Sequence, residues 1–174
     1  MTQIQTQDQW VLFRLEQFYS HTENIQRVKN ILSGESELSL RLIDWFVTNY
    51  SKKKNISFMT KNQRHVVVYL SYKSHLKAYS KRMFDPFCRW KRIQFHDFET
   101  TVGQLNFFEW AITDEILDYI QNNREDIHRD MESRLTEMKD SSKLDGVKKK
   151  RHELSHSATK SLTKHDVKIS VKFE

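Results

Sequence analysis

Apolar residues in the first 50 positions recur every three or four residues, which is the spacing of one face of a helix. The pattern predicts helices in this region, with an interruption at Ser33 and Gly34. Ser39 is a typical N-cap residue, so a further helix is predicted to begin after it. Its apolar positions form one stripe that we expect to be buried: Leu42, Ile43, Phe46, Val47 and Tyr50.

From Ile56 onwards, β-branched and aromatic residues replace the helical pattern. Two short runs with polar residues between them predict a hairpin, and two later runs alternate apolar and polar side chains as strands do. The predicted strands are 56–59, 65–71, 92–98 and 167–173. Tyr72–Met83 suits a short helix that ends before Asp85 and Pro86, because the residue before a proline avoids helical geometry.

A helical pattern returns after residue 100. Thr101 and Gln104 have the spacing of a capping box and predict a helix start, and a second start is predicted near Thr113. A longer apolar series then follows one face of a helical segment whose other face is acidic, with a break predicted at Asn122 and Asn123. That series comprises Ile116, Ile120, Ile127, Met131, Leu135 and Met138.

Together these elements predict an α+β protein with N-terminal helices and a small mixed or antiparallel sheet of about four strands. A long helical segment is expected on one face, and the terminal strand is expected to close the sheet. We expect a main domain over residues 1–140, with its helical part at 1–51. Residues 141–174 are predicted to form a basic linker and a C-terminal strand that joins the same sheet.

Charge is segregated along the chain, although the net charge is only +6. Residues 52–92 hold 12 Lys and Arg and a single acid, Asp85, whereas residues 93–142 hold 4 basic and 12 acidic residues. Lysine and arginine neutralise phosphates, and aromatic side chains interleaved with them can stack on bases, so the basic block predicts nucleic-acid binding. The predicted contact residues are Lys73, Lys77, Lys81, Arg82, Arg89, Lys91 and Arg92, together with the tail residues Lys148, Lys149, Lys150 and Arg151.

Helical spacing sharpens this prediction, because Lys73, Lys77 and Lys81 fall at i, i+4 and i+8 and would form one cationic stripe. Two alternatives stay open. The acidic helices of residues 93–142 could dock on the basic block and cancel its charge. The protein could instead be a virion or assembly protein that binds other proteins through the apolar helix face from Ile116 to Met138 or through its terminal strand.

Other candidate chemistry is weaker. The segment His152–His156 satisfies H-E-x-x-H, the pattern of zinc proteases, but glycine and histidine of the extended form are absent at Thr159 and Leu162, and a basic run precedes it. The single cysteine, Cys88, could be a reactive thiol beside Arg89, and is otherwise a buried apolar group. The acids of residues 114–132 fit a solvated helix face. We therefore expect a non-enzymatic protein with no catalytic residues, no metal and no cofactor.

The lone cysteine and the polar first nine residues indicate a reducing compartment without a signal peptide. The longest apolar run, Val66–Leu70, is far shorter than the ~20 residues that span a membrane, so no membrane contact is expected.

Three stretches resemble small uncharacterised proteins of nucleocytoplasmic large DNA viruses, the giant viruses of algae and protists. They are Leu40–Tyr50, Tyr69–Arg89 and Thr100–Ile112. The resemblance implies no known activity, but it implies a setting: the host cytoplasm or virus factory, or the virion, with a DNA genome to transcribe and package. Nucleic acid and viral proteins are the partners that this setting offers.

Overall fold

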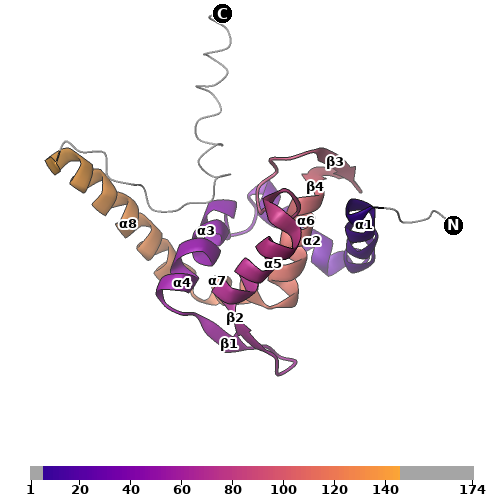
Figure 1. Cartoon of the computed structure of the whole chain (residues 1–174), viewed down its shortest axis with the longest axis horizontal. Helices are drawn as coiled ribbons and strands as arrows, with labels where there is room; N and C mark the ends of the chain where they lie inside the picture. Colours follow the sequence, from indigo (N-terminus) through magenta and orange to yellow (C-terminus); the bar gives the residue numbers. More distant parts are fainter. Residues whose placement is uncertain (1–5, 146–174) are drawn as a thin grey trace, which may run out of the picture.

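A computed structural model describes residues 6–145 of the chain (Figure 1). The N-terminal part is helical, as the periodicity predicts. Its elements are α1 (Gln7–Phe18), α2 (Thr22–Ser33), α3 (Leu40–Trp45), the π-helical turn η1 (Phe46–Tyr50) and α4 (Ser51–Lys53). The predicted cap is confirmed, because the Ser39 side chain accepts a hydrogen bond from the backbone N–H of Leu42 at 3.1 Å. All five positions of the predicted apolar stripe are buried.

Within residues 6–145, four short strands form two separate antiparallel hairpins. The first pairs β1 (Ser57–Met59) with β2 (His65–Val67), and the second pairs β3 (Arg92–Phe95) with β4 (Phe98–Thr101). The α+β class is confirmed, whereas the expectation of one sheet of four strands is corrected to two hairpins. The predicted strand 65–71 ends at Val67, because Val68 and Tyr72 are buried one helical turn apart and belong to the next helix. A turn at His96 and Asp97 divides the predicted strand 92–98.

The core is built around α6 (Val102–Thr113), which carries buried side chains on nearly every side. Its predicted start is confirmed, because Thr101 Oγ1 accepts a hydrogen bond from the backbone N–H of Gln104 at 3.0 Å. Two helices pack against it: α1 on one side and α5 (Val68–Met83) on another (Figure 1). Helices α5 and α6 lie near the middle of the molecule, and α1 lies at its edge (Figure 1).

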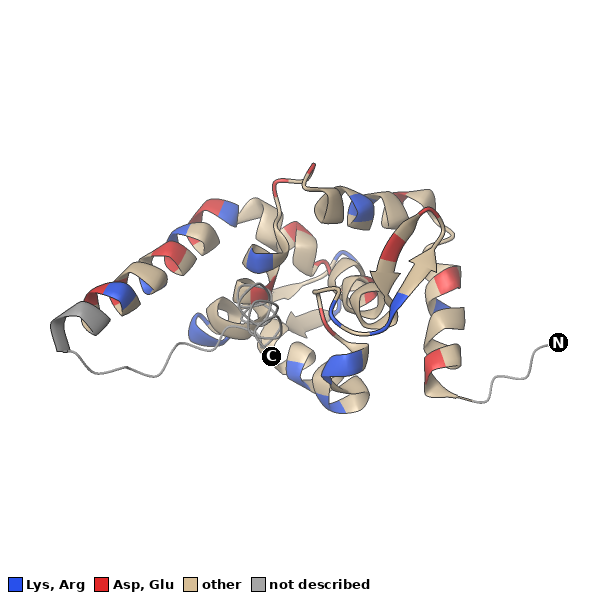
Figure 2. Ribbon diagram, turned by 90° about the horizontal axis from the view of Figure 1, so that it is seen from above, with Lys and Arg blue, Asp and Glu red and all other residues tan. Residues whose placement is uncertain are grey.

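The last described helices are α7 (Ile116–Asn122) and α8 (Arg124–Asp145), and Asn123 separates them where the break was predicted. Ile127 and Met131 of α8 are buried against the core, and Trp45 Nε1 donates a hydrogen bond to Asp130 at 3.1 Å. Helix α8 contacts α3, η1 and α7 and then projects away from the body (Figure 2).

Some predictions concern residues outside the described range. The strand at 167–173, the basic run at 148–151 and the H-E-x-x-H segment at 152–156 all belong to this group. The division between 1–140 and 141–174 stays a prediction for the same reason. Within residues 6–145, no helix combines the length and apolarity needed to cross a membrane.

Candidate nucleic-acid interface and adjacent cavity

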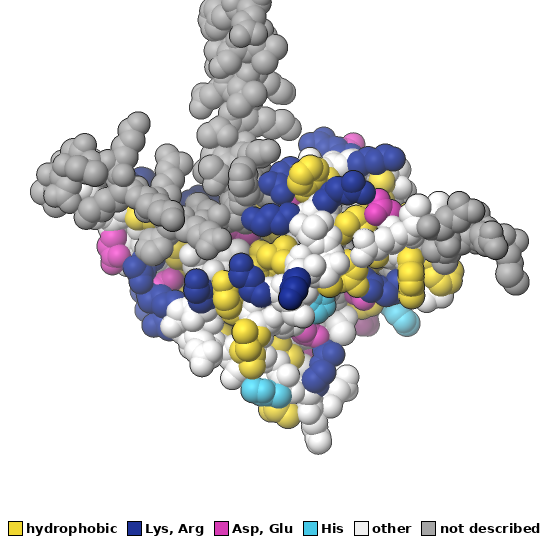
Figure 3. All heavy atoms as spheres, in the orientation of Figure 1, with side chains coloured by type: hydrophobic (Ala, Val, Ile, Leu, Met, Phe, Trp, Pro, Cys, Tyr) yellow, Lys and Arg dark blue, Asp and Glu magenta, His cyan; other side chains and the backbone are white. Residues whose placement is uncertain are grey.

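Lysines from two different elements converge on one tyrosine ring. The ammonium groups of Lys52 in α4 and Lys73 in α5 lie 5.5 Å and 5.6 Å from the centre of the Tyr69 ring. Lys77 lies one turn after Lys73, on the same side of α5. We call Lys52, Tyr69, Lys73 and Lys77 the lysine face. Lys and Arg side chains gather over this part of the molecule in Figure 3.

The lysines and arginines of the predicted site differ in how they are paired. Lys73, Lys77, Lys81 and Lys91 are exposed and form no ion pair within residues 6–145. By contrast, each of the three site arginines within residues 6–145 has an acidic partner. The three ion pairs are Arg82 with Asp8 at 3.0 Å, Arg89 with Asp85 at 3.4 Å and Arg92 with Glu99 at 2.9 Å. Uncompensated charge among the described site residues is therefore carried by the lysines.

A kink in α5 corrects the expected three-lysine stripe. Ser80 has φ 65° and ψ 167°, which interrupts the helical geometry just before Lys81. Lys73 and Lys77 therefore share one helical edge, and Lys81 does not continue it with regular i+4 spacing. The predicted stripe is reduced to two lysines of α5, to which the fold adds Lys52 of α4.

The acidic helix α8 does not cover α5, since it packs mainly against α3, η1 and α7 and points away from α5 (Figure 1). It neutralises one residue of the basic block, Lys53, through an ion pair with Asp130 at 2.9 Å. Asp114, at the end of α6, pairs with Arg64. Acids of residues 93–142 thus cancel part of the basic block, including Arg92, but leave the lysine face unpaired.

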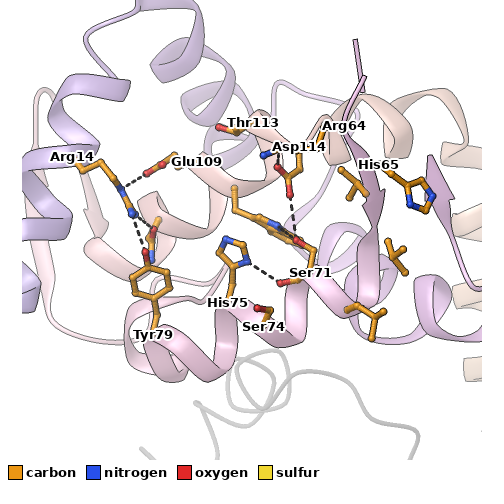
Figure 4. Close-up of a pocket in the computed structure, with 15 residues that line it drawn as sticks. Arg14, Arg64, His65, Ser71, Ser74, His75, Tyr79, Glu109, Thr113 and Asp114 are labelled. Atoms are coloured by element: carbon orange, nitrogen blue, oxygen red, sulfur yellow. Dashed lines mark hydrogen bonds and ion pairs between the residues drawn. The ribbon is translucent and has the colours of Figure 1, made fainter. Parts of the chain in front are cut away.

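A cavity of about 620 Å³ opens beside α5, between α1, α6 and the first hairpin (Figure 4). Its volume falls within the range of about 300–1,000 Å³ that is usual for ligand sites. Polar side chains dominate the labelled wall: Arg14, Arg64, His65, Ser71, Ser74, His75, Tyr79, Glu109, Thr113 and Asp114.

Arg14 organises one end of this cavity. Its guanidinium donates hydrogen bonds to the Tyr79 hydroxyl at 2.9 Å, to Asn106 Oδ1 at 2.6 Å and to Glu109 Oε2 at 3.2 Å. Burial raises the pKa of Glu109, and the charge of Arg14 opposes this shift without cancelling it. Burial alone would lower the pKa of Arg14, but its bond to Tyr79 and its proximity to Glu109 raise that pKa overall.

Asp114 and Ser71 organise the other end. Asp114 pairs with Arg64 and accepts a hydrogen bond from Ser71 Oγ at 3.3 Å, and Ser71 Oγ accepts one from Trp110 Nε1 at 2.9 Å. Between the two ends, His75 Nδ1 donates to the Ser71 carbonyl at 2.8 Å. Because Nδ1 carries the proton in this bond, Nε2 of a neutral His75 is an acceptor. Nε2 forms no hydrogen bond with the described residues.

The structure also shows the surroundings of Cys88 and of the acidic residues that the sequence singled out. Burial raises the pKa of the Cys88 thiol, and the nearby charge of Arg92 offsets this only in part, so the thiolate is disfavoured. Within the described range, no group of three or more His, Cys, Asp or Glu side chains could hold a metal ion. The acids of α8 fit a solvated face, with ion pairs such as Arg129 to Asp126 at 3.7 Å.

The sequence did not indicate the cavity or the full lysine face. Arg14 and Glu109 are 95 residues apart, and neither belongs to a motif. Lys52 belongs to the basic block of residues 52–92 but not to the predicted contact residues, and Tyr69 lies in the predicted strand 65–71. The one local signal was the four-residue spacing of Ser71, His75 and Tyr79, which places all three on one side of a helix once α5 is recognised.

Comparison with known proteins supports the resemblance to giant-virus proteins. The chain is 38% identical over 135 residues to "Uncharacterized protein L507" of Acanthamoeba polyphaga mimivirus, an alignment that covers 70% of this chain and 52% of the relative. The chain therefore spans about half the length of this curated relative. No solved structure matches the chain. The model of a family of unknown function, DUF7197, matches residues 2–174, and the chain belongs to that family.

Proposed function

We propose that the protein is a non-enzymatic nucleic-acid-binding protein whose lysine face contacts the phosphate backbone, in the setting of viral transcription or genome packaging. One observation carries the proposal. Lys52 and Lys73 come from different elements, yet both ammonium groups lie within 5.6 Å of the Tyr69 ring centre, and neither forms an ion pair with a described residue.

Electrostatics explains why this arrangement supports binding to a polyanion. Like charges held close together repel each other, and an acidic side chain between them would relieve that repulsion. Residues 93–142 contain many acidic side chains that could do this. Those on α8, however, lie mostly away from the lysine face. A surface of uncompensated lysines attracts phosphates and releases their counterions on binding.

The alternative hypothesis of a virion or assembly protein is less well supported, because most of the helix face that it requires is buried. Ile116, Ile120, Ile127 and Met131 belong to the apolar helix face that was expected to bind a partner, and all four are buried in the protein's own core. The second surface considered, the terminal strand 167–173, lies outside the described residues. The lysine face is therefore the better supported interface within residues 6–145.

Fluorescence anisotropy with labelled single-stranded and duplex oligonucleotides tests the proposal. Binding is expected to weaken steeply with salt, with a log–log slope on duplex DNA of about −5 if six phosphates are contacted. Replacing both Lys73 and Lys77 by glutamine should reduce the magnitude of that slope by about 2, because each neutralised phosphate contributes ~0.9 to it.

A matched control removes two positive charges elsewhere. Lys29→Gln with Arg129→Gln changes α2 and α8 but leaves α4 and α5 intact. This control should keep the slope within about 0.5 of the wild-type value. Undetectable binding, a flat salt response or equal losses in the two double variants would each refute the proposal.

A further inference from the structure

We infer that the cavity beside α5 receives one unpaired base of a single nucleic-acid strand whose phosphates lie on the lysine face. The inference rests on the proposed function, because the lysines are needed to hold the strand. It adds a second part to the site: a neutral polar compartment for the base, next to a cationic surface for the backbone. Single-stranded nucleic acid is the ligand class that carries both parts with its bases free.

Charge pairing inside the cavity favours a neutral ligand group over a phosphate. Arg14 is paired with Glu109, and Arg64 is paired with Asp114, so each end of the cavity holds one positive and one negative side chain. These four side chains sum to no net charge. A phosphate would have to compete with the carboxylates for the arginines, whereas a base carries no formal charge.

The lining offers what a base needs. The His75 ring lies 5.7 Å from the Trp110 ring and 6.3 Å from the Tyr79 ring, measured between centroids, so aromatic surface forms part of the wall. Ser74 Oγ and His75 Nε2 form no hydrogen bond within the described part of the chain and are open to a ligand. A donor, an acceptor and aromatic faces are the groups that recognise an unstacked base.

Helix α5 joins the two parts of the proposed site. Ser74 lines the cavity and lies three residues before Lys77, so these two side chains are neighbours on the helix surface. Leu70, four residues before Ser74, is 65% exposed at the cavity wall. In Figure 3, histidine and acidic side chains are visible on the same face of the molecule as the lysine-rich area. A strand along the lysines would thus pass the cavity mouth.

The test compares two single strands of equal length in the same anisotropy assay. One carries all its bases, and the other has the same sugar–phosphate backbone with every base removed. The wild-type protein is expected to bind the strand with bases about 5- to 100-fold more tightly, which corresponds to the stacking of one base. Each strand is measured against the wild type and two variants that obstruct the cavity, Ser74→Leu and Thr113→Leu, both at exposed positions.

The preference for bases should shrink to less than about 3-fold in the two obstructed variants, while binding to the baseless strand stays within about 2-fold of wild type. Ser133→Leu, at an exposed position of α8, is the matched control and should keep the full preference. Equal wild-type affinity for both strands would overturn this inference and leave the proposed function standing. Failure to bind either strand would overturn both.

A free nucleotide is the other source of a base. Micromolar adenosine, guanosine, cytidine and uridine monophosphates are therefore added separately to the wild-type measurement. No change in the preference is expected, because the lysine face holds the strand by several phosphates at once. Loss of the preference with any of the four would assign the cavity to free nucleotides and overturn the inference for a strand.

Discussion

Arg14 of α1 and Glu109 of α6 form an ion pair at 3.2 Å that connects the first helix to the central one. Arg14 also donates to Tyr79 of α5, so one side chain joins three helices. Replacing Arg14 by methionine would keep much of its apolar length but leave Glu109 without its partner. We expect a loss of about 1–3 kcal/mol in the free energy of unfolding, measured by urea denaturation. Arg41→Met, at an exposed position of α3, should change stability by less than about 0.5 kcal/mol.

The raised pKa of Glu109 predicts a pH dependence of stability. The folded protein holds the Glu109 proton to a higher pH than the unfolded chain, so stability falls as pH rises above the ordinary value of 4.5. In Glu109→Gln this titration is absent, although the amide can still accept a bond from Arg14. The wild type should therefore lose stability relative to the variant as pH rises above about 4.5 in urea unfolding experiments.

Asp130 provides a comparison of opposite sign. Burial works against ionisation, but hydrogen bonds from Lys53 and Trp45 lower the pKa of Asp130 overall. The stabilisation that ionised Asp130 gives the folded protein is present above its ordinary pKa. It is lost as pH falls through the lowered pKa of the folded state. The free energy of unfolding of the wild type should increase relative to that of Asp130→Asn as pH rises towards the ordinary pKa of 3.8. The same direction of change in both variants would contradict the two assignments.

Gly103 is required by close packing at the start of α6. A Cβ atom at this position would lie 2.6 Å from the carbonyl oxygen of Arg82, and backbone atoms cannot move aside as a side-chain end can. The backbone N–H of Asp85 also donates to the Gly103 carbonyl at 3.2 Å. We expect Gly103→Ala to lower thermal stability by the equivalent of about 2–3 kcal/mol.

Gly34 is the matched comparison for that variant. It has φ 85° and open space around it, so Gly34→Ala incurs only the cost of the left-handed backbone, about 1–2 kcal/mol. A loss at Gly103 smaller than the loss at Gly34 would show that the tight contact is relieved by a shift of α5.

The kink at Ser80 stores backbone strain. Its φ of 65° with ψ of 167° lies in a region used almost only by glycine, at a cost of about 1–3 kcal/mol for other residues. Ser80→Gly should therefore stabilise the protein by about 1 kcal/mol after the entropy of glycine in the unfolded chain is subtracted. Ser74→Gly, in the regular part of the same helix, should instead lose about 0.5–1 kcal/mol. Equal losses in chemical denaturation would rule out strain at Ser80.

Local signals in the sequence predicted local structure correctly. Ser39 and Thr101 cap their helices as expected, because a cap depends on residues only three positions apart. The break near Asn122 and Asn123 is also where α7 ends. These features need no knowledge of the tertiary fold.

Features set by tertiary packing were predicted less well. Residues Val68–Ser71 have high β-propensity, yet they begin α5, because burial of Val68 and Tyr72 on one helical face outweighs that preference. Strand β4, Phe98–Thr101, was not predicted as a separate strand. It follows a tight turn at His96, where φ is 53°, and no residue pattern in the sequence indicates that turn. The spacing of Lys73 and Lys77 was visible in the sequence, but the approach of Lys52 to Tyr69 depends on how α4 meets α5.

The three-helix contact of Arg14 has a consequence for the order of events during folding. One wall of the cavity comes from Arg14 near the start of the chain, and the other walls come from Arg64 and later residues. A folding intermediate in which α5 and α6 have paired but α1 has not docked would lack a closed compartment. A molecule that binds only the complete cavity would therefore stabilise the state in which α1 is docked over the state in which it is not.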